Sequence, residues 1–127
     1  MALETQISVF VKNRVGMLNE LCTALSEANI NIRGLSTVVE ADWAIVGLIV
    51  DDVNKTKEVL HKQNLKFGES TVLTVPMDNI PGQIARITEK LSGQHINIVH
   101  ASLTAEGERC LLVLMTTDNK KANEILG

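Results

Sequence analysis

Two short polar motifs contain the residue types that could bind a small molecule. In the first, Asn13 stands three residues before Gly16, where a predicted strand gives way to a predicted helix. The start of a helix offers free backbone N–H groups and the positive end of the helix dipole, which suit a carboxylate or a phosphate. Gly16 has no Cβ, so a ligand can approach its backbone closely. This spacing predicts an anion-binding turn.

The second motif, "NINIRGLS", places Asn31 at the start of the next predicted strand, which we expect to lie beside the first motif. An amide has both donors and an acceptor, so it matches the carboxylate and the ammonium of a zwitterion. Two amides around a helix start therefore predict a pocket for an amino acid. Turn chemistry is the alternative, because Asn often caps a helix or ends a turn and Gly often makes a tight turn.

Both motifs occur twice. The segments Asn13–His61 and Asn79–Gly127 align without a gap, and the second repeats the three residues above as Asn79, Gly82 and Asn97. The strand motif "NINIRGLS" returns as "HINIVHAS". Self-similarity at a fixed spacing indicates a duplicated unit.

Each copy has the same order of expected elements. "TQISVFV" and "TVLTV" alternate between polar and apolar residues, as half-buried strands do. A loop with Gly and an apolar helical pattern follow, with Pro81 expected in the first helical turn of the second copy. After the second strand, "WAIVGLIV" and "CLLVLM" suit a central strand covered on both faces. A second helix is expected over Val53–Gln63, with its counterpart from near Asp118. The fold class is therefore α+β, with two ferredoxin-like βαββαβ units whose antiparallel sheets carry helices on one face.

Only one extended stretch lies between the two copies. "KFGESTVLTVPM", about residues 66–77, must close the first sheet and open the second, so we expect the units to be 1–69 and 70–127 with this strand shared. The second unit then lacks its last strand. We expect this either to expose an edge that a symmetry mate covers, or to reflect a shortened chain.

Composition excludes several function classes. The net charge of −3 and an aromatic content of 2% argue against nucleic acid and anionic lipid as partners. The longest apolar run, Trp43–Val50, is too short to cross a bilayer, and the start of the chain has no secretory pattern. Cys22 and Cys110 have no pairing motif, which indicates free, buried thiols in a reducing cytoplasm. No metal or cofactor is expected, because the histidines lack ligand spacing.

The stretch "VKNRVGMLNELCTALSEANINIRGL" resembles the core of the ACT domain, a module that senses small molecules and is attached to many enzymes of amino-acid metabolism. "EADWAIVGLIV" is similar to the next strand of tandem ACT proteins. In serine-sensing members, two asparagines at these positions hold the effector. The resemblance therefore implies a ligand site drawn from Asn13, Arg14, Val15, Gly16, Met17, Leu18, Asn31, Ile32, Asn79, Ile80, Pro81, Gly82, Gln83 and Asn97.

The expected function is regulation without catalysis. A free amino acid would bind at interfaces between ACT units and change how the protein, as a homodimer formed through sheet faces or edges, docks on an enzyme of amino-acid metabolism or on itself. Two alternatives remain: a ligand-free oligomerisation module, and an acylphosphatase-like hydrolase in which Arg14 and Asn31 hold phosphate. Ile80 in place of Arg14 in the second copy argues against the hydrolase and favours ligand binding in the first copy.

Overall fold

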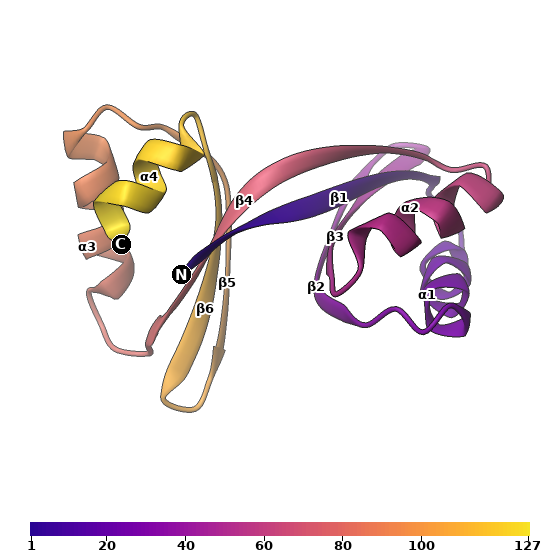
Figure 1. Ribbon diagram of the computed structural model, residues 1–127, viewed down its shortest axis with the longest axis horizontal. Coiled ribbons are helices and arrows are strands. Elements are labelled where there is room, and N and C mark those ends of the chain that lie inside the picture. The colour runs from indigo at the N-terminus through magenta and orange to yellow at the C-terminus, as the bar shows by residue number, and fades with distance from the viewer. The chain divides into compact units, whose positions relative to one another are not determined.

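The computed structural model describes all residues, 1–127, and has its strands and helices in the expected order (Figure 1). The elements are β1 (Ala2–Lys12), α1 (Met17–Glu27), β2 (Ile32–Glu40), β3 (Trp43–Val50), α2 (Val53–Lys62), β4 (Lys66–Asp78), α3 (Gln83–Gly93), β5 (Ile98–Glu106), β6 (Arg109–Thr116) and α4 (Asn119–Leu126). None of the helices is both long and apolar enough to cross a bilayer. The predicted fold class, two ferredoxin-like βαββαβ units, is confirmed.

The chain divides into two compact units that each contain part of β1 and part of β4. One unit is Thr5–Ser70, with the strand order β2-β3-β1-β4. The other is Met1–Glu4 together with Thr71–Gly127, with the order β1-β4-β6-β5. Both orders are those of the ferredoxin-like motif. We call these the first and the second unit.

The closing position of the second unit differs from the sequence-based expectation. No strand follows α4, and instead the first residues of β1 neighbour β4 in this unit. The Thr74 hydroxyl donates to a Glu4 carboxylate oxygen at 2.7 Å, which ties the two strands together. Met1–Glu4 therefore lies outside the unit expected to span residues 1–69. The physical reason is that β1, like β4, is long enough to contribute residues to both units.

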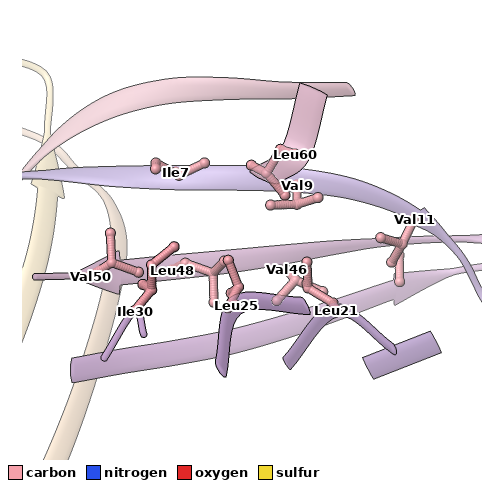
Figure 2. Packing of buried hydrophobic residues seen from close by; sticks show 11 residues of the cluster. Ile7, Val9, Val11, Leu21, Leu25, Ile30, Val46, Leu48, Val50 and Leu60 are labelled. Carbon is pink, nitrogen blue, oxygen red and sulfur yellow. The ribbon is translucent and has the colours of Figure 1, made fainter. Parts of the chain in front are cut away.

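The core of the first unit lies between its sheet and its two helices (Figure 2). Alternate β3 side chains, including Val46 and Leu48, belong to this core together with Leu25 of α1 and Leu60 of α2. An equivalent cluster around Leu91 fills the second unit. Because successive strand residues face opposite sides, the other β3 side chains point away from the helices.

The face of β3 without helices is only partly covered. Trp43 and Ile45 at the start of the strand are 56% and 42% exposed, whereas Ile49 near its end is 6% exposed. The expectation of a strand covered on both faces is therefore wrong for the first half of β3. The cysteines are free as predicted, with Cys110 buried and Cys22 only partly so.

Candidate functional site

The β1–α1 connection has the backbone that its glycine predicts. Gly16 has φ 88° and immediately precedes α1, and Gly82 repeats this before α3 with φ 89°. Residues with a Cβ rarely adopt this conformation, so the glycine is required by the turn. No side chain caps either helix, and an added Cβ would meet no atom within 4 Å at either glycine. Pro81 lies just outside α3 and not in its first turn.

The asparagine of this connection is engaged in holding a turn. The Asn13 side-chain amide donates to the Ala41 carbonyl at 3.0 Å, in the turn between β2 and β3. Asn79 makes the same bond to the Gly107 carbonyl, also at 3.0 Å. The backbone N–H of each asparagine also donates to a carbonyl in the same turn: Asn13 to Asp42, and Asn79 to Glu108. Both amide nitrogens therefore have a structural role, as the turn-chemistry alternative expects.

Asn31 and Asn97 do not lie beside these connections. Strand register pairs Lys12 with Trp43 at one end of β3, and Ile32 with Val50 at the other. At about 3.3 Å per residue, the two ends are about 23 Å apart. The expectation that Asn31 adjoins Asn13 in one unit is therefore wrong, because α1 carries the chain back along the sheet before β2 begins. The second unit repeats this arrangement.

The side chains of Asn31 and Asn97 are exposed and form no hydrogen bond. Only their backbones are tied: the Asn31 N–H donates to Asp51 Oδ1 at 3.0 Å, and the Asn97 N–H donates to Thr117 Oγ1 at 3.0 Å. Ile32, which follows Asn31, packs against the core. These two amides are consequently free to bind a ligand, but not one held by the β1–α1 connection of the same unit.

A pocket of about 480 Å³ opens within the first unit, at the end where β1 stops and α1 starts. It lies between these elements, the start of β3 and the connection from α2 to β4. Its lining is Phe10, Val11, Lys12, Arg14, Met17, Glu20, Leu21, Trp43, Gln63, Asn64, Leu65 and Lys66. This size and the mixture of apolar walls with a few polar groups are typical of small-molecule sites.

Two of the predicted site residues, Arg14 and Met17, line this pocket. Val15 is 99% exposed and Leu18 packs against the core, so neither contributes. The sequence reasoning missed the wall built by Gln63, Asn64, Leu65 and Lys66. The only local signal there is Asn64, whose φ of 56° marks a tight turn.

Charged side chains of both signs line the pocket, and two of them, Arg14 and Glu20, form an ion pair. Arg14 donates to both carboxylate oxygens of Glu20, with Nη1 3.2 Å from Oε1. The hydrogen bonds from Arg14 lower the pKa of the Glu20 carboxyl, and the same pairing raises the pKa of the Arg14 guanidinium. Lys12 and Lys66 also line the pocket, are exposed and form no ion pair. The pocket therefore has two unpaired cations and no unpaired carboxylate.

The corresponding end of the second unit has different chemistry. Asp78 stands in the place of Lys12 and forms an ion pair with Arg109, which replaces Trp43. Ile80 replaces Arg14 and is 58% exposed. Gln83 accepts hydrogen bonds from Arg86 instead of forming an apolar wall. The two units thus share their turn geometry but not the groups around it.

Comparison with solved structures finds the same architecture elsewhere. A protein from Bacteroides thetaiotaomicron is 27% identical, with a TM-score of 0.93 over 98% of this chain and 86% of that one. The regulatory subunit of aspartate kinase from Thermus thermophilus, in a ligand-free form, is 15% identical, with a TM-score of 0.71 over 98% of this chain and 93% of that one. A structure of aspartokinase alpha and beta subunits is 17% identical, with a TM-score of 0.67 over 99% and 95%.

No match was found among curated proteins. The family model described as an ACT domain pair matches residues 1–126, nearly the whole chain, in agreement with the two duplicated units above. This protein therefore belongs to the family of ACT domain pairs.

Proposed function

We propose that this protein is a cytoplasmic regulatory protein without catalysis of its own and that it binds a free amino acid. Binding would change either the activity of a partner enzyme of amino-acid metabolism or the protein's own assembly. The observation that carries the proposal is the pocket of about 480 Å³ beside the β1–α1 connection. Membership of the ACT domain pairs supports it, as does the likeness in fold to a subunit named as regulatory.

The pocket offers a partner for each part of an amino acid. An unpaired lysine, Lys12 or Lys66, can receive the α-carboxylate. The side-chain amide oxygens of Gln63 and Asn64 can accept hydrogen bonds from the ammonium group. The apolar surfaces of Met17 and Trp43 remain for the ligand's carbon skeleton. Binding therefore needs no rearrangement of the Arg14–Glu20 pair.

A homodimer would bring the predicted asparagines together. β2 is an edge strand, bonded on one side to β3 only. If two copies paired their β2 strands antiparallel about a twofold axis at Ser36, the middle of the strand, Ile32 of one copy would lie opposite Glu40 of the other. Asn31 would then approach the other copy's Ala41 turn, which Asn13 holds. This pairing is our proposal for how the free Asn31 amide joins a site between ACT units.

Coupling follows from that geometry. Trp43 lines the pocket and is opposite Glu40 in the β2–β3 register, so the pocket and the proposed dimer edge meet at one end of the unit. A ligand that contacts groups present only in the paired arrangement shifts the population toward it, by as much as its affinities for the two arrangements differ.

The hydrolase alternative finds no support in this geometry. Arg14 is paired with Glu20, and Asn31 lies at the opposite end of the sheet, so one phosphate cannot contact both within a unit. A ligand-free oligomerisation module is the remaining competitor. It makes the opposite prediction for ligand binding, and this separates it from the proposal.

Thermal unfolding in the presence of each common amino acid tests the proposal. A ligand at 100 times its Kd stabilises the folded state by about 2.7 kcal/mol, which should raise the midpoint by roughly 5 to 12 °C in a chain of this size. Trp43→Ala should remove the shift, because it strips one wall of the pocket. Val99→Ala, at an equally exposed residue of the second unit, should keep it. If no amino acid raises the midpoint, the oligomerisation module is the correct interpretation.

A further inference from the structure

The charge balance of the pocket narrows the kind of ligand that it accepts. We infer that the effector is an amino acid with net negative charge, a dicarboxylic one, and that each chain binds one such molecule in the first unit. The inference rests on the function proposed above and specifies its ligand. It is carried by Lys12 and Lys66, which line one pocket from two different strands and have no carboxylate partner.

The carboxylate that lines this pocket is not available to neutralise either lysine. Glu20 is held by two hydrogen bonds from Arg14, and this pairing lowers the pKa of its carboxyl. The Arg14–Glu20 pair adds no net charge to the lining. Lys12 and Lys66 therefore leave the pocket with an excess of two positive charges, in a chain whose net charge is −3.

A neutral amino acid and an acidic one differ in how many of the two lysines they can pair with. The single carboxylate of a neutral amino acid can be received by one lysine, and the other lysine then remains without a counter-ion. A second carboxylate on the side chain would pair with that remaining lysine. The amide oxygens of Gln63 and Asn64 still accept hydrogen bonds from the ammonium group. The methylene groups between the two carboxylates would pack along Met17 and Trp43.

The second unit offers no equivalent site, so the expected stoichiometry is one ligand per chain. Asp78 occupies the place of Lys12 and forms an ion pair with Arg109, so these two groups together add no net positive charge. Ile80 provides no charge where the first unit has Arg14. The two copies of the fold therefore differ in the charge that decides whether an anion binds.

Isothermal titration calorimetry compares each acid with its neutral isostere. L-Glutamate and L-aspartate should bind at one molecule per chain, with a Kd at least about tenfold lower than that of L-glutamine and L-asparagine. A rise from about 50 to about 300 mM salt should weaken binding of the acids more than binding of the amides. Lys12→Gln and Lys66→Gln should each remove most of this preference. Lys90→Gln, an exposed lysine on α3 outside the pocket, should leave it unchanged.

Different outcomes overturn the inference and the proposed function. If an amide or an apolar amino acid binds as tightly as L-glutamate and L-aspartate, the anionic preference is wrong while the amino-acid sensor stands. Binding at two molecules per chain would also contradict it. Succinate, which has two carboxylates and no ammonium, is the third probe. If succinate binds and no amino acid does, the anion site survives and the amino-acid function fails. If no probe binds, both are wrong.

Discussion

The connection from β1 to α1 and its copy from β4 to α3 share a backbone but not a charge pattern. Gly16 and Gly82 have φ values that agree to within a degree, and Asn13 and Asn79 hold the neighbouring turn with the same 3.0 Å hydrogen bond. The charged groups around them differ, as Asp78 in the place of Lys12 illustrates.

Residues that are identical in the two copies are explained by the needs of the fold. A glycine with positive φ and an amide that holds a turn are needed by the fold itself, so both copies keep them whether or not either binds a ligand. Residues that differ between the copies are not required by the shared fold, and these line the pocket of the first unit. In this duplicated chain, difference between the copies indicates chemistry better than identity does.

The largest expected effects test whether the two units are equivalent in their cores. Leu25 and Leu91 occupy the same position in α1 and α3, and both are 0% exposed. Truncating either to Ala leaves a cavity and should destabilise the protein by about 2–5 kcal/mol. Urea unfolding followed by circular dichroism gives the change for each variant. Destabilisations that differ by more than about 2 kcal/mol would contradict equivalent cores, since the spread among such sites reflects how well each can collapse.

A smaller effect should separate the two kinds of asparagine. Asn13→Ala and Asn79→Ala each remove a hydrogen bond that holds a turn, which should cost about 0.5–1.5 kcal/mol of unfolding free energy. Asn31→Ala and Asn97→Ala remove exposed amides without a partner, so the free energy should change by less than about 0.5 kcal/mol. The same urea titration measures all four.

The opposite ranking would show that the free amides stabilise the fold. If instead Asn31→Ala spares stability but weakens both ligand binding and self-association, measured by calorimetry and sedimentation, the proposed pairing of β2 strands gains support.

Much of the fold follows from local patterns. Apolar alternation and helical spacing predict the elements, and the repeat predicts that they occur twice. Local patterns do not predict which unit Ala2–Glu4 joins, because alternation predicts a strand without indicating its partner strand. The first residues of β1 are held in the second unit by contacts such as the hydrogen bond from Thr74 to Glu4, two residues 70 positions apart in the chain.

The candidate site was harder to predict. The helix α1 has 11 residues and spans about 16 Å, so it returns the chain to the far end of the sheet, and Asn31 had to lie away from Asn13. That error was avoidable from helix length alone. The wall from Gln63 to Lys66 was not predictable, because only tertiary packing brings the end of α2 to the start of α1.

The smallest expected effect concerns the ion pair that distinguishes the first unit from the second. The hydrogen bonds from Arg14 lower the pKa of Glu20 in the folded state from its ordinary value of 4.5. A carboxyl with a lowered pKa contributes stability that is present above its unfolded pKa and is lost as pH falls through its folded pKa. Glu20→Gln should therefore flatten the fall of stability with acid below about pH 4.5. The change should be slight, because solvent screens exposed ion pairs.

Urea midpoints measured from pH 6 to pH 3 provide the comparison. Arg86→Gln, at the position in α3 that matches Glu20, removes a charge without touching a carboxyl pair and is the matched control. Its acid profile should run parallel to that of the unmodified protein, while the Glu20→Gln profile converges with it as Glu20 becomes protonated. Equal slopes in all three proteins below pH 4.5 would mean that Arg14 and Glu20 are not paired in solution. Glu20 would then be free to pair with Lys12 or Lys66 and would leave Arg14 unpaired, so the two lysines would no longer be the two cations that receive an acidic ligand.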